Sequence, residues 1–515
     1  MKTKISILIF SLFLGINIYG QNQAKTNAAE TKKINLSLNF SKLKQIAEVD
    51  PRYQSFNIEM CEVVGGKFWI PYEIQDTMKG KRKGGFDALK RKMPPIDLTG
   101  NKVKMLTTAL GPMYIRVSGT WANTIYFQNN DEQELTETPN GYENVLTRYE
   151  WKGVVDFCNA TNAKLVTSFA ICDGMRDKVG NWTPTQMKPL IDYTKSIGGE
   201  IAAAEMFNEP SHANYGGAPK KKYNATYFAK DFAAFKAFAK SAAPEMKILG
   251  PGSTGEKDLL PIEDEMSTDS LFLVTQKPDF DIFSYHYYGG VSKRCFGNLT
   301  PEFALSREWL SKTELGLKYY EEARDKYQPN KDIWLTETAE AACGGNPWAS
   351  TYVDCFRYLE QLGRLAKKNV KIVMHNTLAT SEYAILDHDT YNPRPNYWAA
   401  LLWSKLMGTK VYESGINDEG VDVFVHNLKG TKNGFAVLVV NPTESTYAVN
   451  LPVSAEQYLF TGNGVNLQTK TVELNGKLLK LKADETLPAI NGKKIKAGEI
   501  SMPAHSILFL TFKNN

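Results

Sequence analysis

The sequence has few of the residues that build metal and redox centres. Its 515 residues include only six cysteines and six histidines, with no Cys-x-x-Cys pair and no His-Glu-x-x-His run, so we expect no metal. A Gly-x-Gly-x-x-Gly pattern over 250–255 is interrupted by Pro251 and opens no long helix, so we expect no dinucleotide cofactor. The net charge of +5 is too small to predict nucleic-acid binding.

A long apolar run occurs only at the N-terminus. Lys2 and Lys4 precede apolar residues over 5–18, which predicts a signal peptide over 1–20. The run is too short to span a bilayer, and no cysteine follows the expected cleavage point to carry a lipid anchor. We therefore expect an exported protein, periplasmic or secreted, with no membrane anchor and with a flexible polar lead-in over 21–33. The oligomeric state is left open.

Short β-branched or apolar runs alternate with helix-like segments from about residue 53 to 408. This alternation is typical of parallel strands joined by crossover helices. The number of units favours an α/β fold of the (β/α)8 TIM-barrel type over the competing interpretation, a doubly wound sheet. The predicted barrel strands cover 55–61, 113–117, 164–171, 200–207, 246–250, 281–287, 332–336 and 370–376.

After Gly408, strand-like runs follow one another without helices, which is typical of an antiparallel β-sandwich. The alternation of apolar and polar residues from Ile34 to Phe40 predicts an N-terminal strand that joins the same sandwich. The predicted sandwich strands cover 421–428, 435–440, 447–451, 471–474 and 506–512. The predicted domains are a signal peptide (1–20), a lead-in (21–33), an N-terminal strand (34–45), a barrel (46–408) and a sandwich (409–515).

Two glutamates stand at the ends of predicted barrel strands. Glu209 lies in Asn-Glu-Pro at the end of the fourth strand, where the proline stops the ladder, and Glu337 ends the seventh. Active sites of such barrels lie at the C-terminal ends of the strands. Glycosidic bond hydrolysis needs such a pair, with one acid to protonate the leaving oxygen and one carboxylate to attack carbon or activate water. A separation of about 5 Å predicts retention of configuration, and a wider gap predicts inversion.

Several specific motifs occur in order in the second half of the chain: Trp-Leu-Thr-Glu-Thr at 334–338, Gly344-Gly345, Tyr383, Pro-Asn-Tyr-Trp at 395–398 and Leu-Met-Gly-Thr-Lys at 406–410. In these motifs the sequence resembles clan A of the glycoside hydrolases and, within it, family 79, the heparanase and β-glucuronidase family. The resemblance extends from about residue 55 to 410 and more loosely into the predicted sandwich.

The resemblance implies a role for each matching residue. Glu209 resembles the general acid/base and Glu337 the nucleophile of a double displacement. Arg116 and Tyr287 resemble residues that support the nucleophile, and Asn208 resembles an asparagine that bonds the sugar 2-hydroxyl. Further sugar contacts are implied at Glu59, Thr120, Tyr287 and Asn376. His286 is interpreted separately, as a hydrogen-bonded residue of the barrel wall.

The family resemblance also implies a site for the substrate carboxylate. It would consist of main-chain N–H groups of Cys343, Gly344 and Gly345, together with Tyr383. Glycines let the backbone come close, and neutral donors can bind a carboxylate without an ion pair. Cys343 is unusual at this position, and a bond to another of the six cysteines would fix the loop.

Three residues depart from the family pattern. Ser118 stands where glycine is usual, Glu59 where aspartate is common, and Asn376 where glutamine occurs. Each changes the reach of a side chain by about one bond and therefore alters the expected contacts with the sugar hydroxyls.

The implied function is a retaining glycoside hydrolase that cleaves β-glucuronide linkages, with a glucuronate-containing oligo- or polysaccharide as its partner. Two alternatives stay open: a clan A retaining β-glycosidase acting on a xyloside or glucoside, and a non-catalytic carbohydrate-binding protein. Lysine-rich clusters at 79–83 and 220–222 are predicted to lie on loops at the catalytic face, either as solvated charge or as a rim for an acidic chain.

Overall fold

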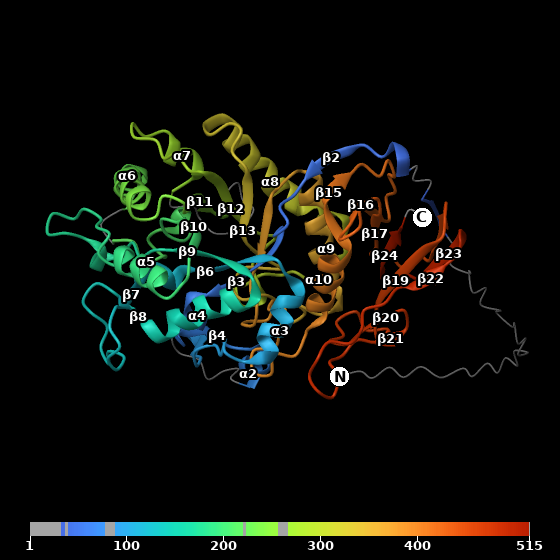
Figure 1. The fold of residues 1–515 in the computed structure, drawn as a ribbon, viewed down its shortest axis with the longest axis horizontal. Helices are drawn as coiled ribbons and strands as arrows, with labels where there is room; N and C mark the ends of the chain where they lie inside the picture. Colours follow the sequence, from blue (N-terminus) through green and yellow to red (C-terminus); the bar gives the residue numbers. More distant parts are fainter. Residues whose placement is uncertain (1–31, 37–39, 78–87, 220–222, 256–265, 514–515) are drawn as a thin grey trace, which may run out of the picture.

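A closed parallel barrel ringed by helices lies beside a β-sandwich in the computed structural model (Figure 1). The structure describes residues 32–36, 40–77, 88–219, 223–255 and 266–513. The predicted signal peptide, nearly all of the predicted lead-in and both lysine-rich clusters lie outside these residues. Within them, no helix combines the length and apolar character needed to cross a membrane.

Eight parallel strands form the barrel, each close to a predicted one. Because β14 pairs with β3, the sheet closes on itself, and the doubly wound alternative is wrong. The strands, in order around the barrel, are β3 (Gln54–Glu59), β6 (Met113–Ser118), β9 (Ala163–Ser168), β10 (Ile201–Glu205), β11 (Lys247–Ser253), β12 (Ile282–Tyr288), β13 (Ile333–Ala339) and β14 (Ile372–His375).

Helices cover the outside of the barrel, and their ends follow ordinary capping chemistry. Thr147 caps the first long helix of this layer, α4, in a reciprocal capping box with Glu150. The helices are α1 (Met60–Val63), α2 (Tyr72–Thr77), α3 (Asn101–Leu110), α4 (Arg148–Thr161), α5 (Met187–Ser196), α6 (Ala225–Ala242), α7 (Thr268–Phe272), α8 (Arg307–Tyr327), α9 (Tyr352–Lys367) and α10 (Pro395–Leu406). Two small two-stranded sheets lie in the loops after β3 and β6: β4 (Lys67–Trp69) with β5 (Lys90–Lys92), and β7 (Ile125–Gln128) with β8 (Asn144–Thr147).

The barrel interior changes from apolar to polar along the strands. Near the strand starts it is filled by apolar side chains, among them Tyr114 and Trp334, whose ring centroids are 5.0 Å apart. Two residues later on β6 the inward position holds Arg116, and the corresponding position on β10 holds Glu205. Because inward positions recur every second residue, the polar layer lies above the apolar plug, toward the C-terminal ends of the strands.

The sandwich packs a three-stranded sheet on a nine-stranded one, and it takes two N-terminal strands instead of one. The predicted single strand over 34–45 is therefore wrong: β1 (Lys32–Asn35) pairs with β18, whereas β2 (Gln45–Glu48) pairs with β15. The predicted barrel boundary at 46 needs the same correction, because β2 belongs to the sandwich. The other strands are β15 (Met407–Tyr412), β16 (Asp422–Leu428), β17 (Phe435–Asn441), β18 (Tyr447–Leu451), β19 (Ala455–Gly462), β20 (Val472–Leu474), β21 (Lys477–Leu478), β22 (Lys493–Ile495), β23 (Gly498–Met502) and β24 (Ser506–Phe512).

Helix α9 joins the barrel to the sandwich through a close packing contact. A Cβ atom placed on Gly363 of α9 would lie 2.5 Å from the Phe424 ring of β16. On the same side, Arg307 and Arg364 both form ion pairs with Asp422 of β16. A larger residue at position 363 would require the Phe424 ring or the nearby backbone to shift.

We predict that Gly363→Ala lowers the free energy of unfolding by about 1–3 kcal/mol, because the added methyl group overpacks the junction. Gly153→Ala on α4 is the matched control: its Cβ would meet nothing within 4 Å, so the change should stabilise the helix by about 0.5–1 kcal/mol. Urea unfolding of both variants measures the difference, and equal effects would show that the junction is not tightly packed.

Candidate active site

Two glutamates meet at the C-terminal ends of the barrel strands. Glu209 follows β10 with φ 52°, at the start of the short turn η5 (Pro210–His212), and Glu337 lies within β13. A carboxylate oxygen of Glu209 lies within 4.8 Å of one of Glu337. The side chain of Glu209 is 17% exposed and that of Glu337 is 8% exposed, so both carboxylates remain open to a ligand.

A β-bulge in β13 turns Glu337 into the barrel. The pairing with β12 passes from Leu335 directly to Glu337, so Thr336 has no partner on the neighbouring strand. Thr336 nevertheless points inward, because its hydroxyl donates to Glu205 at 3.0 Å. The extra residue therefore places two successive side chains on the inner face, a common use of bulges beside active sites.

Tyr288, one residue after the predicted Tyr287, contacts the carboxylate of Glu337. Its hydroxyl donates to Glu337 Oε1 at 2.6 Å and accepts from Asn376 Nδ2 at 3.0 Å. Tyr287 belongs to the outer core between strands and helices. The prediction of Tyr287 as the supporting residue is wrong, because successive side chains on a strand point to opposite faces.

Arg116 is the buried cation of the site. Its guanidinium contacts Glu205 at 2.7 Å and Glu337 at 2.9 Å, and its side chain is 1% exposed. Burial opposes the charge, but Glu205 and Glu337 outweigh it and raise the pKa of Arg116. In turn, although burial raises the pKa of Glu205, Arg116 and His286 lower it to about 2. Both carboxylates next to Arg116 are thus paired with a permanent positive charge.

His286 lies between Glu209 and Glu337. The sequence predicts it to be a hydrogen-bonded residue of the barrel wall, and it also contacts both glutamates. Its Nδ1 atom is 3.0 Å from Glu209 Oε1 and 3.7 Å from Glu337 Oε2. Burial lowers the pKa of His286, but Glu337, Glu205 and Glu209 raise it to about 9. Burial also raises the pKa of Glu209, yet the hydrogen bond with His286 brings it below its usual value.

Asn208, predicted to bond the sugar, is fixed by a second asparagine that the sequence did not indicate. Its main-chain N–H donates to Asn123 Oδ1 at 2.8 Å, and Asn123 Nδ2 donates to its carbonyl at 2.9 Å. Its own side-chain oxygen accepts from Arg116 at 2.8 Å. These contacts orient the residue that directly precedes Glu209.

Glu59 and Asn376 form a second layer beside Glu337. Asn376 Nδ2 donates to Glu59 Oε1 at 2.9 Å, and burial together with the charge of Glu337 raises the pKa of Glu59 well above its usual value. Gly119, with φ 92°, leaves room for the Glu59 carboxylate, since a Cβ there would lie 1.7 Å from Glu59 Oε2. Thr120 is exposed at the start of the turn η3 (Thr120–Thr124) and has no contact with this layer among the described hydrogen bonds.

The loop after β13 lies against Tyr383, so the residues that the resemblance implied for a carboxylate site are neighbours. Cys343, Gly344 and Gly345 have φ values of 64°, 78° and 80°, and a Cβ on Gly345 would lie 3.1 Å from the Tyr383 ring. Cys343 forms a disulfide with Cys295, while the other four cysteines are free and buried. Within the described residues, the main-chain N–H groups of the two glycines donate no hydrogen bond, although both glycines are buried.

Glu209, His286 and Glu337 could also be regarded as possible metal ligands, because their ligand atoms lie within 4.8 Å of one another. Arg116 makes this interpretation unfavourable. Its Nη1 atom already donates a hydrogen bond to Glu337 Oε2 at 2.9 Å, and its Nη2 atom lies 3.3 Å from His286 Nε2. A second cation at the same oxygen and ring would meet direct repulsion.

A family model described as glycosyl hydrolase family 79, N-terminal domain, matches residues 91–363. This span holds Arg116, Glu209 and Glu337 and more than half of the chain. The chain belongs to glycosyl hydrolase family 79. It is therefore a glycoside hydrolase, which agrees with the function predicted from the glutamate pair.

Relatives of this family 79 member match over most of their length. Heparanase of Bos taurus is 26% identical, over 81% of this chain and 85% of its own. Baicalin-beta-D-glucuronidase of Scutellaria baicalensis is 24% identical over 81% of this chain and 83% of its own length. Hyaluronoglucuronidase of Hirudo nipponia is 25% identical over 78% of this chain and 87% of its own length. A solved 4-O-alpha-L-rhamnosyl-beta-D-glucuronidase from Fusarium oxysporum 12S shares the fold, with TM-score 0.61 at 11% identity over 91% of this chain and 97% of its own.

We predict that Tyr288→Phe lowers kcat/KM on an aryl β-glycoside about 10–100-fold, because Glu337 loses a charged hydrogen bond of about 1.5–3 kcal/mol. Tyr287→Phe is the matched control and should leave kcat/KM unchanged, since Tyr287 faces the outer layer. Steady-state kinetics on one substrate tests both variants. A larger loss in Tyr287→Phe would reverse our assignment.

Proposed function

We propose that this family 79 enzyme cleaves β-glucuronide linkages with retention of configuration, in a double displacement. Glu337 attacks the anomeric carbon while Glu209 gives a proton to the leaving oxygen, and a covalent glycosyl-enzyme forms. Water, deprotonated by Glu209, then displaces Glu337 and releases the β-product. Asn208, fixed beside the acid, is the proposed partner of the sugar 2-hydroxyl.

The closeness of the two carboxylates is the observation that carries the proposal. Their nearest oxygens lie within 4.8 Å, whereas an inverting enzyme needs a gap of about 6.5–9.5 Å to hold a water between the carboxyls. The carboxylate of Glu337 also has a hydrogen-bond donor at each of its two oxygens. Arg116 donates to Oε2 and Tyr288 donates to Oε1. Both contacts hold the carboxylate in one orientation.

Glu209 and His286 share the proton that the acid step requires. With the pKa of Glu209 lowered and that of His286 raised to about 9, the pair holds one proton near neutral pH, placed mainly on the imidazole. Nδ1 of His286 is 3.0 Å from Glu209 Oε1, so the proton can pass along this hydrogen bond to Glu209 as it protonates the leaving group. Interacting groups of this kind titrate as a pair rather than singly.

The glucuronate preference rests on the loop after β13. Buried main-chain N–H groups that lack an acceptor are rare in folded proteins, and Gly344 and Gly345 present two of them side by side within the described residues. A substrate carboxylate would satisfy both, and the buried Tyr383 beside Gly345 offers a third donor. Two of the relatives reported above are named as glucuronidases.

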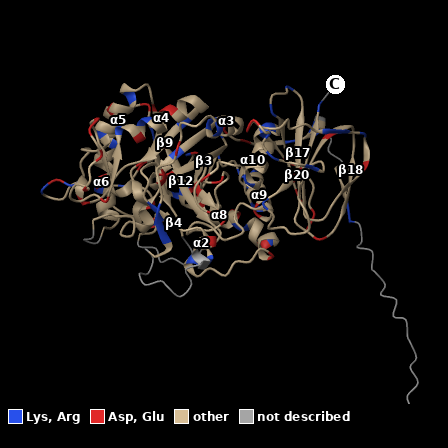
Figure 2. Cartoon of the chain, turned by 90° about the horizontal axis from the view of Figure 1, so that it is seen from below, with Lys and Arg blue, Asp and Glu red and all other residues tan. Residues whose placement is uncertain are grey.

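A polymeric acidic substrate is the proposed partner. The two-stranded sheet of β4 and β5 carries Lys67, Lys90, Arg91 and Lys92, and Figure 2 shows a basic (blue) segment beside the β4 label, with acidic (red) residues near β3 and β12. Trp69 of this sheet lies close to Gly344, since a Cβ there would be 2.6 Å from Trp69 Cδ1. We also propose that the enzyme is exported, to which the Cys295–Cys343 disulfide adds support.

We predict that an aryl β-D-glucuronide is cleaved with a higher kcat/KM than the matching β-D-glucoside and β-D-xyloside, and that proton NMR shows the β-anomer as the first product. Glu337→Gln should abolish turnover without abolishing binding of the glucuronide. A preference for the glucoside or xyloside would favour the neutral-sugar alternative. Binding without turnover in the unchanged enzyme would favour a carbohydrate-binding protein, and an α-anomer as first product would exclude retention.

A further inference from the structure

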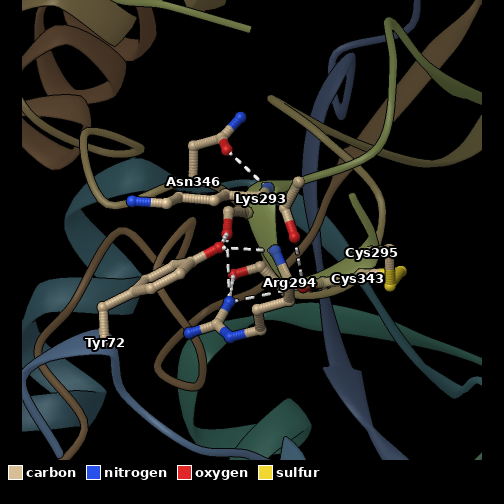
Figure 3. The surroundings of a disulfide bond; sticks show 9 residues. Tyr72, Lys293, Arg294, Cys295, Cys343 and Asn346 are labelled. Atoms are coloured by element: carbon tan, nitrogen blue, oxygen red, sulfur yellow. Dashed lines mark hydrogen bonds between the residues drawn. A yellow bond between two sulfur atoms is a disulfide. The ribbon is translucent and has the colours of Figure 1, made fainter. Parts of the chain in front are cut away.

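Arg294, from the loop after β12, lies behind the proposed carboxylate-binding loop. Its side chain is 1% exposed, and its Nη1 atom donates to three successive carbonyl oxygens: Cys343 at 3.3 Å, Gly344 at 3.1 Å and Gly345 at 3.0 Å. Figure 3 shows the guanidinium beside the Cys295–Cys343 disulfide, with Tyr72 across its face. Neither the sequence motifs nor the proposed mechanism accounts for this arginine.

The direction of these hydrogen bonds fixes the direction of the neighbouring N–H groups. In a planar trans peptide the N–H points opposite to the C=O of the same unit. Because Arg294 donates hydrogen bonds to the carbonyl oxygens of Cys343 and Gly344, the N–H groups of Gly344 and Gly345 must point away from Arg294. The same geometry holds for the third peptide, whose N–H, on Asn346, meets the Glu340 carboxylate at 2.9 Å.

We propose that Arg294 is the positioning residue that makes the enzyme selective for a sugar acid. It holds the peptides that carry the N–H groups of Gly344 and Gly345 with these two donors facing the substrate, and it places a buried positive charge one peptide away from the bound carboxylate. The inference rests on the proposed glucuronidase function and extends it, because Arg294 itself never contacts the sugar. A planar guanidinium suits the task, since lysine carries the same charge without the fork of donors.

Several contacts keep Arg294 in this place. Its Nη2 atom bonds the carbonyl of Ile70 at 2.9 Å and Glu382 at 3.0 Å, and its guanidinium carbon lies 3.9 Å from the centre of the Tyr72 ring. The Tyr72 hydroxyl accepts from the main-chain N–H of Arg294 and donates to the Gly345 carbonyl, each at 3.2 Å. Tyr72 therefore joins the loop after β3 to the other two loops.

The disulfide ties together the two segments that Arg294 also bridges. Cys295 follows Arg294 directly, and its bond to Cys343 joins the loops after β12 and β13. Ser292 supports the same arrangement, since its hydroxyl donates to the Cys343 carbonyl at 3.0 Å and its N–H to the Ala342 carbonyl at 3.0 Å. Loss of the disulfide should therefore loosen the loop less than loss of Arg294, which holds the peptides themselves.

The test compares kcat/KM on an aryl β-glucuronide with that on the matching aryl β-glucoside in full-length variants. Arg294→Gln should lower the glucuronide-to-glucoside ratio about 10–100-fold, mostly through KM, because the carboxylate loses oriented donors. Arg294→Lys should lower it less, and the double variant Cys295→Ser/Cys343→Ser least. Arg324→Gln is the matched control, since within the described part of the chain the side chain of Arg324 donates hydrogen bonds to Asp325 and to the Lys331 carbonyl near the end of α8, and this variant should keep the ratio.

Inhibition by free D-glucuronate gives a second measure of how tightly each variant binds the sugar acid. Thermal unfolding of the same variants shows whether they are folded, so that weaker inhibition can be told apart from a general loss of stability. Equal losses on both substrates in folded Arg294 variants overturn the proposal. If Arg294→Gln does not fold, an unchanged ratio in both Arg294→Lys and the cysteine variant overturns it as well. Failure of the unchanged enzyme to cleave the glucuronide would instead refute the proposed function, whatever the variants do.

Discussion

The ion pairs of Arg116 are the interaction on which the active site depends. Glu205 and Glu337 are both buried in a polar layer of the barrel, and an unpaired carboxylate at that depth would cost several kcal/mol or become protonated. Arg116 pairs with both at once and bonds Asn208 as well. Glu205 has no proposed chemical step, but it balances the arginine and supplies one of the charges that raise the pKa of His286. The site is a network of linked charges in which the proposed nucleophile is one member.

The loops above this layer are tied to one another by side-chain contacts and a disulfide. The bulge at Thr336 brings Glu337 inward, and the loop that follows β13 has three positive φ angles in succession. That loop is bonded to segments after β3 and β12 by Tyr72, Arg294 and the disulfide (Figure 3). The proposed nucleophile and the proposed carboxylate site thus belong to one continuous segment, and donors that are already held in place suit catalysis because they need not reorganise during the reaction.

The barrel and the catalytic pair could be predicted from the sequence because each depends on local patterns. Buried parallel strands appear as apolar runs, and a glutamate beside a proline at a strand end is visible without any three-dimensional information. The alternation of side chains could also have indicated that His286 and Tyr288 share the inner face, which the family motif alone did not. The sandwich strands β19 and β22 lack an alternating burial pattern, so their periodicity gave no clear signal.

The remaining features depend on contacts between distant segments. The bulge at Thr336, the partner of Cys343 and the pairing of Glu205 with Arg116 are all set by the closure of the barrel. Arg294 lies about fifty residues before the loop that it orders, and a single arginine after a strand carries no local mark of such a role. Likewise, the split of the N-terminus between two sheets depends on where β15 and β18 lie.

The pH dependence of kcat/KM in His286→Gln tests the shared-proton account most directly. In the unchanged enzyme the Glu209–His286 pair keeps its proton until the pH approaches the His286 pKa of about 9, so activity should fall only at alkaline pH. Without the imidazole the last proton lies on Glu209 alone, and a carboxylic acid loses it earlier. The account predicts that the alkaline limb moves to lower pH in His286→Gln. An alkaline limb that stays in place, with only the maximum rate reduced, would contradict it.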